Sequence, residues 1–214
     1  MNISLHMTRN PLTAGPETSI SAVNKIMKDN HFRHLPIVDS EGCLLGMVTD
    51  RDLRSALPSS VAAPDTKLPT CKTMEKTPVR EIMSREITAL NEFSTIDDAL
   101  IILDRKKIGA LPIIDKDKRL IGIFSTRDLI IAYRDLFGLG EKGSALVAVK
   151  NDGKPRPLSR IVHIMEAHDI HFSRIVLKGT LEDQRRDGVI YVRVNTYNLH
   201  AVHAALKEAG FTIL

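Results

Sequence analysis

The chain has little of what several classes of protein require. Its 214 residues include two cysteines, no tryptophan and three tyrosines. Cys43 and Cys71 form no CxxC motif and require no disulfide, which fits a reducing compartment. No segment approaches the roughly 18 apolar residues of a membrane span, and the first residues lack the basic start and apolar stretch of a signal peptide. We therefore expect a cytoplasmic protein that does not contact a membrane.

Charge of one sign is not concentrated anywhere in the sequence. The formal net charge is +4, from 30 Lys and Arg against 26 Asp and Glu. The basic residues are scattered, and the few aromatic side chains offer little on which single-stranded bases could stack. The composition thus disfavours a nucleic-acid partner, although a nucleic-acid-linked regulator stays open. The mild positive balance suits an anionic small molecule equally well.

Catalytic and metal-binding motifs are also missing. The patterns GxSxG, GxxxxGK[ST], HExxH and CxxC do not occur. Residues 138–143 spell GxGxxG, but a predicted helix precedes them and a strand follows, which reverses the order of the dinucleotide fingerprint. His200 and His203 are closely spaced, but no third ligand stands at a recognisable spacing. We predict no catalytic residue, no metal site and no enzyme activity, and interpret 138–143 as a hinge.

What the chain does contain is a repeat. Residues 35–53 return as residues 111–129 at an offset of 76, without a gap, and nine of these nineteen positions are identical. Each copy reads Leu-Pro, two apolar residues and Asp, and later Gly, two apolar residues, Thr or Ser, any residue and Arg-Asp. Such self-similarity indicates two similar structural units. A unit of about 50 residues is marginal alone, so we expect the two to pack together and leave a cleft between them.

The two repeats are expected to share one order of elements. The apolar patterns predict a short strand, a helix, two buried strands and a second helix in each copy. Ile20, Val23 and Met27 mark one face of the first helix, and Ile96, Ala99, Leu100 and Leu103 mark its counterpart. The predicted segments are repeat 1 at 1–57 with its short strand at 12–14, a proline-rich linker at 58–78, and repeat 2 at 79–137 with its short strand at 87–89 and one extra residue before the helix.

Residues 144–214 follow a different order. The pattern predicts strand, helix, strand, strand, helix, strand, which is the order of a ferredoxin-like sandwich. The expected strands are 145–149, 175–177, 189–194 and 211–214, with a charged hairpin loop at 180–188. The expected fold class is therefore mixed α/β (α+β), with two βαββα repeats and a βαββαβ domain.

The repeated pattern resembles a tandem pair of CBS domains, also called a Bateman module, over about residues 1–137. The last unit resembles an ACT domain, and the order CBS–CBS–ACT is similar to acetoin-utilisation proteins of the AcuB type. The resemblance implies a non-catalytic regulatory protein, a homodimer, that binds AMP, ADP or ATP, with or without Mg²⁺, between its repeats. An NAD or S-adenosylmethionine sensor and a ligand-free interaction scaffold stay open as alternatives. The regulated target is not indicated.

Candidate ligand-binding residues gather at the predicted helix starts. Phosphate favours helix N-terminal amides, hydroxyls and a cation, and a ribose diol can donate to a carboxylate. The alternative is that these hydroxyl and carboxylate residues only cap helices. The candidates are Thr49, Arg51, Ser125 and Arg127 for phosphate, Asp52 and Asp128 for ribose and, on the family resemblance, Thr13, Thr88, Pro36 and Pro112 for adenine. Thr126, beside Ser125, is a further ligand-binding candidate.

The two repeats differ at two places that bear on phosphate. Repeat 1 has Arg33-His34 before its Leu-Pro, whereas repeat 2 has Gly109-Ala110. The resemblance implies that such a basic pair reaches ligand phosphates, so we predict unequal sites that depend mainly on Arg33 and His34; a solvated strand end is the alternative. Repeat 1 also has Asp50 where repeat 2 has Thr126. Asp50 would either repel phosphate or help to hold a metal-bound nucleotide.

The last unit departs from the ACT pattern before its first helix. An amino-acid-binding ACT domain has Asp and Gly in a tight loop there, but in residues 151–157 the glycine is displaced and two prolines intervene. The resemblance therefore does not imply an amino-acid effector. The simpler role is the pairing of sheets between two chains, which fits the exposed edges that this fold leaves.

Overall fold

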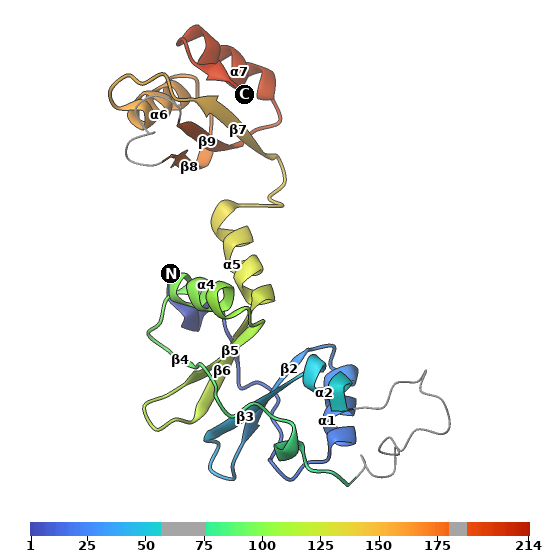
Figure 1. Cartoon of the computed structure of the whole chain (residues 1–214). Helices are drawn as coiled ribbons and strands as arrows, with labels where there is room; N and C mark the ends of the chain where they lie inside the picture. The colour runs from blue at the N-terminus through green and yellow to red at the C-terminus, as the bar shows by residue number, and fades with distance from the viewer. Residues whose placement is uncertain (57–75, 180–187) are drawn as a thin grey trace. The chain divides into compact units, whose positions relative to one another are not determined.

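The computed structural model describes residues 1–56, 76–179 and 188–214, in two compact units, Met1–Ile130 and Ile131–Leu214 (Figure 1). Unit 1 holds nearly all of both repeats. Most of the expected linker and nearly all of the expected hairpin loop lie outside the described residues. Within the described ranges, every helix falls short of the length and apolarity that a membrane crossing requires.

The first helix of repeat 1 forms as the apolar spacing predicts. α1 (Ile20–Asp29) begins after Ser19, whose hydroxyl accepts the Ala22 N–H at 3.3 Å. Ile20, Val23 and Met27 are buried on one face of the helix, which confirms the predicted core positions. A short helix, α2 (Asp50–Ala56), ends the described part of this repeat.

Repeat 2 also contributes two helices, of 11 and 12 residues. α4 (Ile96–Lys106) begins with a capping box in which Thr95 and Asp98 hydrogen-bond each other's backbone N–H. The prediction that Leu100 shares the buried face is wrong, because Leu100 is 39% exposed while Ile96 is fully buried. α5 (Thr126–Phe137) follows the Arg-Asp motif.

Each repeat contributes an antiparallel pair of strands at the centre of a small sheet. The repeat 2 sheet has the order β1-β6-β5-β4, with only β4 parallel to its neighbour. In repeat 1, single bridges from Ser84 to Met47 and from Ala14 to Ile37 extend the central pair to the same order. The strands are β1 (Thr8–Arg9), β2 (His34–Val38), β3 (Leu44–Thr49), β4 (Leu90–Asn91), β5 (Ala110–Ile114) and β6 (Leu120–Ser125).

The sheet register corrects the alignment of the two short strands. Ala14 pairs with Ile37 and Leu90 pairs with Ile113, and each residue lies 76 positions from its counterpart. The predicted strand at 87–89 is therefore wrong, since the strand lies at Leu90–Asn91. No extra residue precedes the second helix. Thr88 therefore corresponds to Leu12. The predicted extra residue had implied that Thr88 corresponds to Thr13.

The repeats exchange their N-terminal segments. β1 of repeat 1 pairs with β6 of repeat 2, where Thr8 lies opposite Ile123. In the reciprocal exchange, the Met47 N–H donates to the Ser84 carbonyl at 3.0 Å and the Ser84 N–H donates back at 2.9 Å. Because each repeat completes the sheet of the other, residues from both repeats line any pocket beside these segments.

The glycine in the repeated motif serves this exchange. A Cβ atom on Gly46 would lie 2.6 Å from Sδ of Met83, and one on Gly122 would lie 2.5 Å from Sδ of Met7. Both methionines belong to the exchanged segments. The motif glycines therefore allow the close approach of one repeat to the other, a role that is distinct from backbone freedom in a turn.

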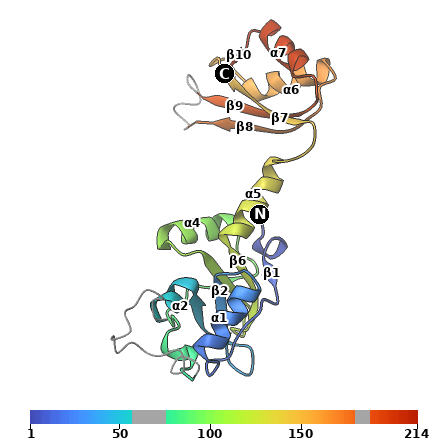
Figure 2. The ribbon, with the colours of Figure 1, turned by 90° about the vertical axis from the view of Figure 1, so that its right-hand side faces the viewer.

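Unit 2 has the strand order predicted for its last 71 residues. Its four-stranded antiparallel sheet runs β10-β7-β9-β8, and α6 and α7 lie together on one face of that sheet (Figure 2). Its core combines that face with the two helices. The elements are β7 (Ser144–Lys150), α6 (Pro157–Ala167), β8 (Phe172–Lys178), β9 (Val189–Asn195), α7 (Leu199–Glu208) and β10 (Thr212–Ile213).

Candidate functional site

Two pockets open in unit 1, and both repeats line each of them. The first pocket has a volume of about 920 Å³ and the second about 660 Å³, within the roughly 300–1,000 Å³ that is usual for small-molecule sites. Every lining residue except Arg54 and Asp128 has a counterpart 76 positions away that lines the other pocket. The pockets therefore reproduce the symmetry of the repeat.

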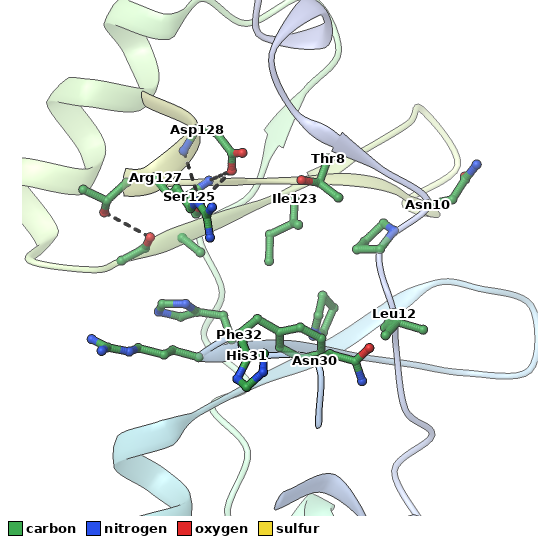
Figure 3. Close-up of a pocket in the computed structure, with 17 residues that line it drawn as sticks. Thr8, Asn10, Leu12, Asn30, His31, Phe32, Ile123, Ser125, Arg127 and Asp128 are labelled. Carbon is green, nitrogen blue, oxygen red and sulfur yellow. Dashed lines mark hydrogen bonds between the residues drawn. The ribbon is translucent and has the colours of Figure 1, made fainter. Parts of the chain in front are cut away.

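The first pocket lies between two walls (Figure 3). Asn30, His31 and Phe32, which follow α1 of repeat 1, face the β6–α5 junction of repeat 2 across the opening, and Asn10 and Leu12 lie at one side. Residues from both repeats are needed for a complete site. The predicted residues that line this pocket are Arg33, His34, Pro36, Ser125, Thr126, Arg127 and Asp128.

The second pocket combines the same elements with the repeats interchanged. Its lining contains residues 106–110, at and after the end of α4, residues 49–51 at the β3–α2 junction, and residues 84 and 86–88. The predicted residues that line it are Arg33, His34, Thr49, Arg51, Thr88 and Pro112. Arg33 and His34 thus line both pockets.

Two predicted residues line neither pocket. Thr13, expected at the adenine slot, lies outside both linings, and its neighbour Leu12 lines the first pocket instead. Asp52 is absent from the lining of the second pocket, whereas its counterpart Asp128 lines the first. The candidate ribose carboxylates are therefore not equivalent.

The hydroxyl and carboxylate of each motif are bonded to each other. Asp128 Oδ2 accepts the Ser125 N–H at 2.8 Å and the Ser125 hydroxyl at 2.6 Å. Asp52 Oδ2 makes the equivalent bonds to Thr49 at 2.8 and 2.7 Å. These are the bonds of a helix cap, as the alternative interpretation requires. Among the described residues they occupy only Oδ2 of Asp128, so Oδ1 can accept from a ligand hydroxyl.

His34 lies at the junction of the two pockets, packed on Gly109. A Cβ atom on Gly109 would lie 2.7 Å from Cε1 and 2.8 Å from Nε2 of His34, so a larger residue there would displace the imidazole. Burial lowers the pKa of His34, and the positive charge of Arg33 lowers it further, against smaller opposing effects of Asp52 and Asp50. At neutral pH the charge of the predicted basic pair therefore resides on Arg33.

The lowered pKa of His34 predicts a loss of stability in acid. Between the folded pKa and the unfolded value near 6.5, the unfolded chain binds a proton that the folded chain does not, so the free energy of unfolding falls as the pH falls through this range. Urea midpoints at pH 7.5, 6.5 and 5.5 measure the effect. The fall should be smaller in His34→Gln; an equal fall in both proteins would contradict the assignment.

Asp50 does not present a free charge to the second pocket. Its carboxylate is paired with the guanidinium of Arg54 one helical turn later, and this hydrogen bond lowers the pKa of Asp50. The pair removes much of the expected repulsion of phosphate.

Among the described residues, no group of three or more His, Cys, Asp or Glu side chains could hold a metal ion.

Several pocket residues were not predicted from the sequence. Most of them lie on the exchanged segments or at and just after the end of the first helix of each repeat, while Met47 and Ile123 lie on the central strands β3 and β6. An offset of 76 from any one of them would have identified its counterpart, but only the pairing of the exchanged segments brings them into a pocket. Among them are Thr8, Asn10, Pro11, Leu12, Asn30, His31, Phe32 and Ile123 in the first pocket, and Met47, Ser84, Glu86, Ile87, Lys106, Lys107 and Ile108 in the second.

Relatives of known sequence match chiefly the two repeats. A CBS domain-containing protein of Dictyostelium discoideum is 31% identical over 124 residues, which cover 58% of this chain and 85% of that protein. L-aspartate semialdehyde sulfurtransferase of Methanocaldococcus jannaschii is 28% identical over 58% of this chain, but the match spans only 21% of the enzyme. The enzyme's activity is therefore not carried over with the match.

Solved structures share the fold of the paired repeats. A putative acetoin utilization protein (AcuB) from Vibrio cholerae has a TM-score of 0.55 at 30% identity, with 66% of this chain and 96% of that chain covered. CBSX2 in complex with AMP has a TM-score of 0.54, and the CBS domain pair of protein MJ0100, in complex with 5-methylthioadenosine and S-adenosyl-L-methionine, has 0.52. Each is 25% identical and covers 64% of this chain and 98% of its own.

The family assignment rests on both copies of the repeat. The CBS domain profile matches residues 2–59 and again residues 79–135, which together make up more than half of the chain. These two segments contain the exchanged N-terminal strands, the paired hairpins and both pockets. The chain belongs to the CBS domain family, as a tandem pair.

Proposed function

We propose that the protein is a non-catalytic regulator that binds an adenine nucleotide in the pockets between its two CBS repeats. The observation that carries this proposal is the pair of pockets related by the 76-residue offset. Each joins a hydroxyl residue and an arginine at a helix start of one repeat to a proline and apolar side chains of the other. The neighbouring structures with AMP and with adenosyl ligands support it.

The chemistry of the first pocket suits the three parts of a nucleotide. Ser125 and Arg127 stand at the start of α5, where a hydroxyl, a guanidinium and the helix N-terminus favour phosphate. Asp128 offers a carboxylate oxygen to a ribose hydroxyl. Leu12 and Pro36 provide apolar surface for a base. Binding would regulate by favouring one arrangement of the repeats over another, to the extent that the ligand's affinity differs between the arrangements.

A second candidate ligand class is the S-adenosylmethionine type, since one neighbouring structure holds 5-methylthioadenosine and S-adenosyl-L-methionine. Thermal unfolding of the purified protein with AMP, ADP, ATP with and without Mg²⁺, NAD and S-adenosylmethionine separates these candidates. A ligand at 100 times its Kd should add roughly 2.7 kcal/mol to the stability. A rise with one of these ligands identifies the signal. No rise with any of them would favour a ligand-free scaffold.

Unit 2 is proposed to be an ACT-like assembly domain that holds two chains together. Leu146 and Val176 are 53% and 41% exposed, and β8 is an edge strand. Each of these two residues is the chain neighbour of a residue that packs in the core, Val147 and Ile175, so both lie on the sheet face away from that core. Exposed apolar surface beside a free edge favours association. Light scattering after size exclusion should give the mass of a dimer, and Val176→Lys should lower the measured mass.

A role in acetoin or related metabolism is proposed only from the likeness to AcuB.

A further inference from the structure

The two pockets carry different charges at equivalent positions. Where the first pocket has Asn30 and His31, the second has Lys106 and Lys107. We propose that the second pocket is the site for a nucleoside di- or triphosphate, and that the first takes an adenosyl ligand with a less anionic tail. This inference rests on the proposed function, because it assumes that both pockets receive adenosyl ligands.

Lys106 is placed to act on a ligand in the second pocket. Its Nζ donates to the hydroxyl of Thr88 at 2.5 Å, and both residues line that pocket. Lys106 takes part in none of the ion pairs within the described ranges. Lys107 differs, because its Nζ donates to Asp104 Oδ1 at 2.8 Å, and Asp104 is not part of the lining. Lys106 therefore accounts for most of the difference in positive charge between the two pockets at these positions.

The acidic residues of the second pocket do not cancel this charge. Asp50 is already paired with Arg54, which leaves Glu86 as the other carboxylate of the lining. Against it stand Lys106 and two arginines, Arg33 and Arg51. The second pocket thus keeps the larger excess of positive charge. Each additional phosphate on a ligand raises the negative charge that these cations can stabilise.

The first pocket has fewer cations and a carboxylate of its own. Arg33 and Arg127 are its two permanently charged bases, and Asp128 opposes them. Leu12 occupies the position that Thr88 holds in the second pocket, which replaces a hydroxyl with an apolar side chain. A nucleoside, a monophosphate or an adenosyl thioether fits this lining better than a triphosphate.

A reciprocal exchange of the equivalent residues tests the proposal. Calorimetric titrations with ATP and with adenosine, both in EDTA, compare the wild type with Lys106→Asn and Asn30→Lys. In Lys106→Asn, ATP affinity should fall about tenfold, as for the loss of a charge-assisted hydrogen bond, while adenosine affinity stays within about twofold. In Asn30→Lys, the weaker class of ATP sites should strengthen.

Arg105→Asn is the matched control, because it removes one positive charge from the same helix outside both pockets and should leave both affinities unchanged. Unchanged ATP affinity in Lys106→Asn, with adenosine binding intact, would overturn this proposal alone. A tenfold loss of ATP affinity in Arg105→Asn would also overturn it, since general charge would then explain the effect. If neither ligand binds the wild type, the proposed function fails and this proposal fails with it.

Discussion

Replacement of Asp128 by alanine should weaken the binding of an adenosine ligand to the first pocket by about 1.5–3 kcal/mol, roughly 10- to 150-fold. The reason is that Oδ1 of Asp128 is open to a ribose diol while Oδ2 is held by Ser125. A bond to an ionised carboxylate is worth more than one between neutral groups. Isothermal titration calorimetry with AMP and adenosine measures the loss, which should be similar for the two ligands.

The chain offers a matched control for this experiment. Asp98 has the same capping box with Thr95, with Oδ2 accepting the Thr95 N–H at 2.9 Å and its hydroxyl at 2.7 Å, but it lines neither pocket. Asp98→Ala therefore removes a cap of the same kind without removing a candidate ligand group. Equal losses of affinity in Asp98→Ala and Asp128→Ala would mean that Asp128 only caps α5. Asp52→Ala should cost less than Asp128→Ala, because Asp52 is outside the pocket lining.

The local features of the fold were predictable because they depend on neighbours in the sequence. The spacing of Ile20, Val23 and Met27 predicts both a helix and its buried face, since residues three and seven apart share a helix face. The repeated motif identified the helix starts and their Ser, Thr, Arg and Asp residues. Strand alternation and Gly210 after the last helix gave the order of unit 2.

The composition of each pocket was not predictable in the same way. The pairing of Ser84 with Met47, and of Thr8 with Ile123, joins residues 37 and 115 positions apart in the chain. No local pattern encodes such an exchange. A strand of two residues also carries too little periodicity to fix its own register, which is why the short strand of repeat 2 was expected at 87–89 and lies at Leu90–Asn91.

Charge reversal of Arg33 should weaken ATP binding about 10- to 100-fold and adenosine binding less than about threefold, because a phosphate tail meets the reversed charge and an uncharged nucleoside does not. Arg33 lines both pockets, so Arg33→Glu should affect every ATP site that the protein has. Burial still lowers the pKa of His34 in this variant, although the further lowering by Arg33 is lost. Titrations of the wild type and the variant with ATP, AMP and adenosine at fixed ionic strength measure the loss of affinity for each ligand.

Arg105→Glu makes the same change in net charge at an exposed position that lines neither pocket, and its ATP affinity should fall less than about threefold at physiological salt, where distant surface charges are screened. Equal losses for ATP and adenosine in Arg33→Glu would exclude a contact with phosphate and favour the solvated strand end. A loss for ATP at only one class of site would mean that Arg33 turns toward a single pocket when a ligand is bound. A loss of affinity that is largest for ATP, smaller for AMP and smallest for adenosine would therefore show that Arg33 contacts the phosphates of the ligand.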